Sequence, residues 1–259
     1  MAIIEVRCVT KVFGGRDWAK PWKRISVTRA LNEVSINFES GKTAVLLGPN
    51  GSGKTTLLKL LSTILLPDSG TLQVCGHDTE SAGDQVRTMV GFAVGSERSF
   101  FPRLTARENL EFFAVLEEIP APMTARRVEE VLGAVNLTAD SDKHVMKFSS
   151  GMLHRLGIAR AILKSPRVLL LDEPSRSLDP AACEQLWQML GSFKGSGTTI
   201  LVASHNFEET AAIADTVAVL DEGRVAGCEN FTARGDATAV RDLYFSVSDS
   251  RKKMAGATR

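Results

Sequence analysis

The residues from Gly48 to Thr56 have the types and spacing needed to bind phosphate. They read GPNGSGKTT and match the pattern G-x-x-x-x-G-K-[ST]. Glycines let the backbone approach a phosphate closely, and consecutive N–H groups followed by a helix N-terminus attract an anion. Lys54 would neutralise β- and γ-phosphate charge, and the Thr55 hydroxyl would reach Mg²⁺. The candidate nucleotide-binding residues of this loop are Gly48, Pro49, Asn50, Gly51, Ser52, Gly53, Lys54, Thr55 and Thr56.

Two neighbouring carboxylates could supply the second half of such a site. Asp172 and Glu173 follow four apolar residues at 168–171, a run typical of a buried strand. Ligand sites of open α/β sheets lie at the carboxyl ends of the strands. Asp172 would hold Mg²⁺, directly or through water, and Glu173 would orient and polarise an attacking water. Alone, the pair could be a solvated strand end. Together with the phosphate loop, it predicts a nucleotide hydrolase.

Strands and helices must alternate to position these groups. The apolar segment Thr43–Leu47 predicts a buried strand before the loop, and apolar residues at helical spacing over 54–65 predict a helix after it. The order predicts an α/β core with an all-helical insert. Further strands are predicted at 3–9, 30–38, 71–76, 89–94, 167–171 and 198–203 and in a hairpin of 216–220 and 224–226, and further helices at 124–135, 149–163, 181–190 and 207–214.

Residues 105–164 are predicted to be mostly helical. Thr105 precedes Glu108 by three positions, which is a capping-box pattern and predicts that a helix begins there. Pro120 and Pro122 break that helix, because proline lacks an N–H and clashes with the preceding turn.

Composition excludes several classes of protein. The 259 residues carry 31 Lys and Arg against 30 Asp and Glu, so a uniformly basic nucleic-acid coat is excluded. We expect neither a signal peptide nor a membrane span, because no run approaches about 18 apolar residues. The four cysteines are scattered without metal-binding or redox spacing, so we expect buried or half-buried thiols in a reducing compartment.

The segment 147–161 narrows the class of hydrolase. It reads KFSSGMLHRLGIARA and resembles the signature motif and following helix of ATP-binding cassette (ABC) proteins. Other elements of that family follow in order: Asp172-Glu173-Pro174, Ser177-Leu178-Asp179 as the D-loop, and Ser204-His205 as the switch histidine. The resemblance covers about residues 3–228.

The resemblance implies the domain organisation. We expect an α/β P-loop hydrolase core with an antiparallel β lobe and an all-helical insert at about residues 97–155, all within an ABC cassette at 1–228. Residues 229–259 would form a C-terminal helix and a flexible basic tail, frayed over 246–259.

The resemblance also implies a mechanism. Two cassettes would dimerise head to tail, with ATP between the phosphate loop of one and the signature of the other. Ser149, Ser150 and Gly151 would bind the γ-phosphate at a helix N-terminus that they also cap. His205 would hold the water geometry, or serve only as a hydrogen-bonded structural residue, and Asp179 would communicate across the dimer. The implied sets are Glu173, His205 and Lys54 for catalysis, Thr55 and Asp172 for the metal, Ser149, Ser150, Gly151 and Met152 for the partner's ATP, and Ser177, Leu178 and Asp179 for the D-loop.

The chain departs from the family pattern in its polar motifs. Ser150 stands for glycine and Met152 for glutamine in the signature, so the loss of an amide puts polar contacts at Met152 in doubt. The glutamine of the family's Q-loop is missing, and Ser96 or Glu97 could replace it.

Two further departures concern aromatic residues. The adenine-stacking residue is usually tyrosine, and Phe13 is the candidate here, with a core phenylalanine as the alternative. The basic stretch 11–29 holds Trp18 and Trp22. It could touch a lipid surface or nucleic acid, or form a solvated hairpin that the tryptophans pack down.

The resemblance implies an ATPase subunit that uses ATP and Mg²⁺ to power an ABC transporter. The variant motifs favour the exporter branch, which moves drugs, lipids or glycoconjugates through a separate multi-span membrane subunit. Phe100 and Phe101 could line a groove for a helix of that subunit, or pack internally. The second cassette would be another copy or a paralogue, no nucleic-acid partner is expected, and the location would be the cytoplasmic face of the inner or plasma membrane. The alternatives are a soluble ABC ATPase acting on nucleic acid, ribosomes or cofactor assembly, and an importer ATPase.

Overall fold

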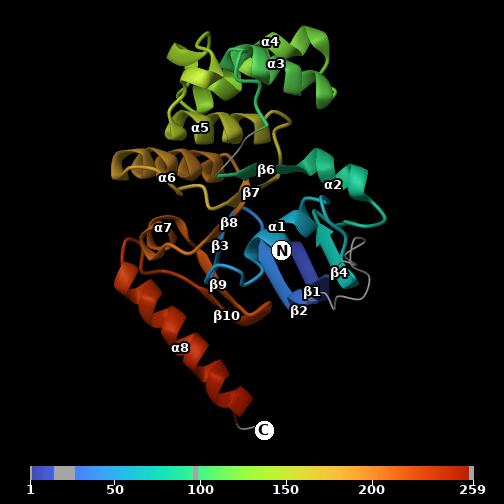
Figure 1. Ribbon diagram of the computed structural model, residues 1–259, viewed down its shortest axis with the longest axis vertical. Helices are drawn as coiled ribbons and strands as arrows, with labels where there is room; N and C mark the ends of the chain where they lie inside the picture. Colours follow the sequence, from blue (N-terminus) through green and yellow to red (C-terminus); the bar gives the residue numbers. More distant parts are fainter. Residues whose placement is uncertain (1, 15–26, 96–98, 257–259) are drawn as a thin grey trace, which may run out of the picture. The chain divides into compact units, whose positions relative to one another are not determined.

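The computed structural model describes residues 2–14, 27–95 and 99–256, with the side chains of the last helix described as far as Val247 (Figure 1). The chain divides into two compact units. The first unit comprises Met1–Ser40, Ala44–Val86 and Ala203–Arg259, and the second comprises Gly41–Thr43 and Arg87–Val202.

An antiparallel sheet forms part of the first unit. Its strand order is β2-β1-β4-β5, with β1 at Ala2–Phe13, β2 at Thr28–Glu39, β4 at Ser69–Val74 and β5 at His77–Asp78. Val6 lies opposite Ile36 on one side and Leu72 on the other, and all three are buried. The antiparallel β lobe is therefore present. Strands β1 and β2 run beyond 3–9 and 30–38, because their pairing continues to the Phe13–Thr28 pair.

The rest of the first unit contains the strand that leads into the phosphate loop. That strand, β3 (Thr43–Leu47), is buried at every position and pairs in parallel with β9 (Thr216–Asp221), which pairs antiparallel with β10 (Arg224–Asn230). Strand β10 continues past residue 226 because its ladder with β9 extends to the Asn230–Thr216 pair. The helices are α1 (Lys54–Leu61), α7 (Phe207–Ile213) and α8 (Ala237–Gly256).

The segment 246–259, which we expect to fray, is helical as far as Gly256, and fraying of this helix end stays a prediction. Helix α8 continues through these residues (Figure 1). The composition explains the difference, because arginine, lysine, methionine and alanine at 251–255 are all good helix formers. A polar, basic sequence is therefore compatible with a helix.

Three neighbouring strands position the carboxylates in the second unit. Their order is β8-β7-β6, with β6 at Val90–Val94, β7 at Val168–Asp172 and β8 at Thr199–Ser204, whose last two residues belong to the first unit. Strand β6 is parallel to β7, and Val94 pairs with Asp172. Every residue of β7 is buried, as its apolar run predicts.

Helices make up the remainder of the second unit. Helices α3 (Ala106–Leu116), α4 (Ala121–Ala134) and α5 (Ser150–Ala161) pack together, and α6 (Pro180–Gly195) lies beside α5 (Figure 1). Helix α4 begins at Ala121 rather than 124. Its first turn accepts a proline, because the N–H that proline lacks would have no intrahelical partner there. The short elements are α2 (Gly83–Met89), whose first residues belong to the first unit, and the 3₁₀ turns η1 (Thr138–Asp140) and η2 (Val145–Lys147).

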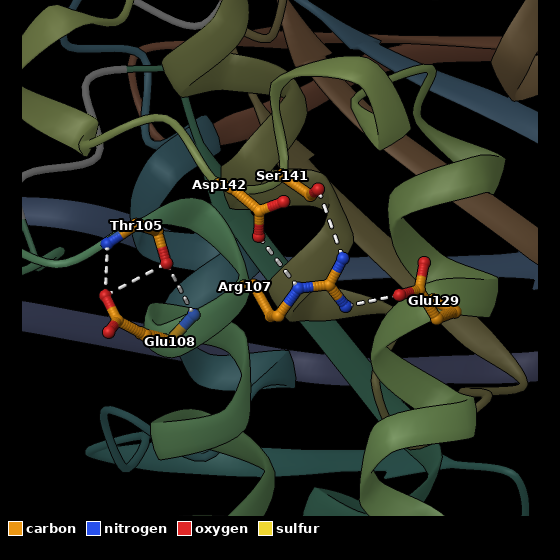
Figure 2. A network of polar contacts seen from close by, with 6 residues as sticks. All are labelled: Thr105, Arg107, Glu108, Glu129, Ser141 and Asp142. Carbon is orange, nitrogen blue, oxygen red and sulfur yellow. Dashed lines mark hydrogen bonds and ion pairs between the residues drawn. The ribbon is translucent and has the colours of Figure 1, made fainter.

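Arg107 joins α3 to α4 and to the loop that leads toward the signature (Figure 2). Its guanidinium donates to Asp142 Oδ1 at 3.1 Å and to Ser141 Oγ at 3.1 Å, and it forms an ion pair with Glu129. Hydrogen bonds from Arg107 to Glu129 and then Asp142 raise the pKa of the guanidinium. One side chain on α3 thus fixes both neighbouring segments.

The predicted capping box at the start of α3 is confirmed (Figure 2). The Thr105 N–H donates to Glu108 Oε2 at 2.7 Å, and the Glu108 N–H donates to Thr105 Oγ1 at 3.1 Å. The bonds from the Thr105 backbone and hydroxyl lower the pKa of the Glu108 carboxyl.

The four cysteines form no disulfide in the part of the chain that the structure describes. Cys75 and Cys183 are half-buried as expected, whereas Cys8 and Cys228 are exposed. Both exposed cysteines lie in β-strands, where one face of the strand meets solvent.

Candidate nucleotide-binding site

The phosphate loop joins β3 to α1 in the first unit. Gly53 precedes α1 with φ 105° and carries no side chain to cap it, so the N-terminus of the helix stays open to an anion. A Cβ on Gly53 would lie 2.5 Å from the Ala30 carbonyl oxygen, and one on Gly48 would lie 2.1 Å from that of Leu220. Both approaches exclude a larger residue, so the loop needs these glycines to close.

Lys54 is held within the loop that it would help to charge. Its side chain is buried, and Nζ donates to the carbonyl oxygens of Gly48 at 2.7 Å and Pro49 at 3.0 Å. The Ser52 carbonyl accepts from the Gly223 N–H at 3.0 Å, which anchors the loop to the turn after β9. The loop thus holds a buried ammonium group against its own carbonyl oxygens.

Phe13 and His205 also belong to the first unit. Phe13 is 42% exposed, so it is not a core residue, and Lys11 Nζ lies 5.8 Å from its ring centroid. His205 is exposed and follows β8. The next residue, Asn206, caps α7 by accepting from the Glu208 and Glu209 N–H groups at 2.8 and 3.1 Å. Both side chains are accessible, as a nucleotide contact requires.

The carboxylate pair lies at the end of β7 in the second unit. Asp172 is 7% exposed, and its carbonyl accepts from the Gly95 N–H at 2.9 Å. Glu173 has a left-handed backbone with φ 49°, and Arg176 Nη1 lies 3.6 Å from its carboxylate. Left-handed geometry at a non-glycine residue is uncommon and often marks a functional position.

The contribution of Gly95 is not evident from the sequence alone. A Cβ there would lie 2.2 Å from the Glu173 backbone carbonyl oxygen, so only glycine allows the end of β6 to lie against the Glu173 backbone. A glycine directly after a predicted strand was the available signal. Ser96 and Glu97, the candidates for the Q-loop position, lie outside the described residues, as do Trp18 and Trp22.

The signature residues begin α5. Ser149 caps the helix by accepting from the Met152 N–H at 3.3 Å, and the Ser150 hydroxyl lies 3.4 Å from the Ser177 carbonyl oxygen. Ser149 and Ser150 are exposed, but Met152 is buried, with Lys143 Nζ 3.9 Å from its sulfur. The methionine side chain therefore packs inward and does not extend the exposed polar edge of the signature.

The segment predicted to form the D-loop lies against the predicted signature residues. Ser177 has φ 64°, and Asp179 caps α6 by accepting from the Ala182 N–H at 2.8 Å. A cavity of about 430 Å³ separates α5 from α6, with Gly151 and His154 in its wall. Burial lowers the pKa of His154.

Within the part of the chain that the structure describes, no helix has both the length and the apolarity to cross a membrane.

The family profile described as "ABC transporter" matches residues 31–176, more than half of the chain. The chain belongs to the ABC transporter family. The family expected from the motifs is therefore confirmed.

Curated relatives in this family include drug-resistance and export proteins. The chain is 37% identical over 203 residues to the daunorubicin resistance ATP-binding protein DrrA3 of Streptomyces coeruleorubidus, covering 78% of this chain and 64% of that protein. It is 37% identical over 202 residues to the Nod factor export ATP-binding protein I of Ralstonia nicotianae, covering 78% and 63%. The chain thus spans just under two thirds of these relatives.

Solved ABC structures share the fold. A dimeric ATP-binding cassette, MJ0796, in a post-hydrolysis state with bound ADP and Pi matches with a TM-score of 0.76 at 25% identity, covering 90% of this chain and all of that one. The protein cbiO1 from Clostridium perfringens, part of an ABC transporter complex, matches with a TM-score of 0.75 at 26% identity, covering 88% of each chain. These matches confirm the predicted fold class.

Proposed function

We propose that this protein is the ATP-hydrolysing subunit of an ABC transporter, and that it powers export of a drug, lipid or glycoconjugate. The observation that carries the proposal is the phosphate loop, where the buried Lys54 ammonium lies beside an open helix N-terminus. Membership of the ABC family supports ATP as the nucleotide. The names of the drug-resistance and Nod factor export relatives support export as the direction.

In the proposed mechanism, ATP binds with its β- and γ-phosphates on the loop. Lys54 exchanges its bonds with the Gly48 and Pro49 carbonyls for bonds with phosphate oxygens, which draws the charge of the phosphates into the loop. Thr55 and the buried Asp172 would hold Mg²⁺, because a hydroxyl and a carboxylate suit this hard cation. The ion would supply neutralisation of the phosphate charge.

The hydrolytic step uses Glu173 and His205. The Glu173 carboxylate accepts a hydrogen bond from water and orients it toward the γ-phosphate. The Arg176 guanidinium, 3.6 Å away, restricts where that carboxylate lies. His205 contacts the γ-phosphate and fixes its orientation relative to the water. Phe13, exposed at the end of β1, stacks on the adenine.

A second cassette completes the site in this proposal. The exposed Ser149 and Ser150 hydroxyls and the N-terminus of α5 bind the γ-phosphate of the ATP held by the other subunit. Gly151 allows the backbone to approach it. The dimeric state of the matching solved cassette supports this arrangement.

The membrane partner would dock on an apolar face of the helical insert. Phe101 is 43% exposed and packs edge-on against Phe112, with ring centroids 4.8 Å apart. Phe100 is buried against Phe113, so only Phe101 of the two aromatic candidates can meet a partner. This face also exposes Val115 and Leu116 on α3. We propose that it receives a helix of the membrane subunit at the cytoplasmic face of the membrane.

The decisive experiment uses Glu173→Gln and the matched control Glu184→Gln, which changes an exposed glutamate on α6. Glu173→Gln should lose hydrolysis by about 100-fold or more, because the water loses its base, while still binding ATP. With saturating Mg-ATP it should sediment as a dimer, whereas Glu184→Gln should hydrolyse normally. A Glu173→Gln variant that hydrolyses normally or stays monomeric would contradict the proposal.

Tagged Glu173→Gln then tests for the membrane partner. With ATP present, it should co-purify a multi-span protein from detergent-solubilised membranes of the native host. Adding Phe112→Asp should abolish that capture without changing ATP binding, because the charge disrupts the apolar face. Capture of soluble proteins or nucleic acid alone would leave the ATPase chemistry in place and refute transport.

A further inference from the structure

The C-terminal segment supports α7, the helix that begins two residues after His205. The Gly235 N–H donates to the Ala211 carbonyl at 2.9 Å, and the Phe231 N–H donates to the Asp215 carbonyl at 2.8 Å. Arg234 forms an ion pair with Asp215. These contacts attach the later part of α7, and the residues directly after it, to the segment that follows β10.

Helix α8 also packs against α7 (Figure 1). The guanidinium carbon of Arg241 lies 5.7 Å from the centroid of the Phe207 ring, within range of a cation–π contact. The Tyr244 ring lies 5.7 Å from the same centroid. Phe207 is the first residue of α7, so two residues of α8 fix the point at which that helix begins.

Arg241 and His205 also border one cavity. The cavity has a volume of about 500 Å³ and contains both side chains in its wall, together with Phe207 and Thr238. Strand β8 ends at Ser204, and only His205 and Asn206 separate it from α7. The position of the His205 backbone is therefore set by β8 on one side and by the start of α7 on the other.

We propose that Arg241 is a positioning residue for ATP hydrolysis: through its cation–π contact with Phe207 it fixes the start of α7 and thereby orients His205 toward the γ-phosphate. This inference rests on the role of His205 in the proposed function. It makes Arg241 of α8 part of the hydrolytic apparatus, although this residue lies outside the phosphate-binding and signature motifs. A catalytic contact is sensitive to displacements of about 0.5 Å, which a missing support can produce.

The expected effect is on turnover rather than on nucleotide binding. In the full-length protein, Arg241→Ala should lower kcat about 5-fold and leave the KM for ATP unchanged, because the phosphate loop is untouched. Arg241→Lys keeps a cation that can contact the ring, so it should restore part of kcat. Asp242→Ala, the matched control at the next and exposed residue of α8, should keep wild-type kcat.

A double-mutant cycle with His205→Ala distinguishes positioning from general destabilisation. Residual hydrolysis is measured with radiolabelled ATP for His205→Ala and for His205→Ala combined with Arg241→Ala. If Arg241 acts through His205, the second substitution should have no further effect in the His205→Ala background. An equal 5-fold loss in both backgrounds, or an unchanged kcat in Arg241→Ala, would overturn the inference.

Two further outcomes keep the causes separate. If His205→Ala itself keeps wild-type kcat, the proposed role of His205 fails, and the inference fails with it. If Arg241→Ala does not fold, Arg241→Gln, which keeps a long side chain, replaces it in the same cycle and is judged by the same two outcomes.

Discussion

At the scale of single residues, the phosphate loop contains a buried hydroxyl whose hydrogen bonds are unmade. Ser52 is 3% exposed, and its Oγ is buried without a hydrogen-bond partner. Its backbone carbonyl, in contrast, accepts from the Gly223 N–H. The backbone of this residue thus serves the loop, while its side chain carries a desolvation cost.

Ser52→Ala should therefore stabilise the nucleotide-free protein. Removing an unsatisfied buried hydroxyl is expected to raise the free energy of unfolding by about 1 kcal/mol, which raises Tm by about 2–4 °C in a chain of this size. The Kd for ATP should not change, because the N–H groups of the loop remain. Thermal unfolding and a nucleotide titration check both values. A lower Tm would mean that the hydroxyl makes a hydrogen bond in solution.

Lys54→Ala, in contrast to Ser52→Ala, should weaken the binding of ATP. The Kd for ATP is expected to rise by about 10-fold or more, because the ammonium is the charged group that the loop holds against its own carbonyls. Lys59→Ala, on the same helix, is the matched control and should keep wild-type affinity. Equal affinity of Lys54→Ala and wild type for ATP would show that the loop is not the phosphate-binding site.

What the sequence predicts at this scale is limited to groups whose neighbours are close along the chain. The glycines and Lys54 are recognisable because loop and helix are contiguous. The inward packing of Met152 and the contact of Gly95 with Glu173 were not predictable, because their neighbours are distant in sequence. The roles assigned to Ser96 and Glu97 stay predictions.

At the scale of elements, hydrophobic period predicts most of the strands and helices, and pairing sets where they end. The apolar runs of β3 and β7 predict buried strands, and both are buried at every position. The short helix α2 was missed, because a helix of seven residues that begins at a glycine has too few turns to show a period. The extents of β10 and α8 depend on a partner strand and on helix propensity rather than on apolar pattern.

The capping box of α3 gives a pH-dependent prediction. Hydrogen bonds from Thr105 lower the pKa of Glu108. The ionised form of this carboxylate is therefore more favoured in the folded state than in the unfolded state. Its contribution to stability is complete above the unfolded pKa of about 4.3 and is lost as pH falls through the lower folded value. Glu108→Ala should therefore lower Tm at pH 7, and this difference from wild type should shrink as pH falls below about 4.3.

Thermal unfolding of wild type and Glu108→Ala across this pH range provides the measurement. Glu111→Ala, one turn further along α3, is the control for loss of a carboxylate on the same helix. A difference between wild type and Glu108→Ala that stays constant from pH 7 to below the folded pKa would show that the cap acts without its charge.

At the scale of the whole molecule, Gly151 of the signature distinguishes what folding requires from what dimerisation requires. A Cβ on Gly151 would lie 3.6 Å from Leu178 Cδ2 and 3.9 Å from Ala182 Cβ, which are ordinary van der Waals contacts. The folded chain therefore accepts alanine at this position. If the glycine is required, the requirement comes from what approaches α5 from outside, which in the proposed function is the partner's γ-phosphate.

Gly151→Ala should accordingly keep or raise Tm while it impairs the dimer. Alanine is favoured over glycine in a helix by about 0.5–1 kcal/mol, so stability should not fall. In the Glu173→Gln background with Mg-ATP, Gly151→Ala should sediment as a monomer, because the added methyl occupies the space of the phosphate. Gly133→Ala on α4, where a Cβ meets only Thr138 Oγ1 at 3.8 Å, is the matched control and should dimerise normally. If Gly151→Ala dimerises as fully as the control does, the signature does not hold the partner's nucleotide through this glycine, and the ATP-dependent dimer must form through another surface.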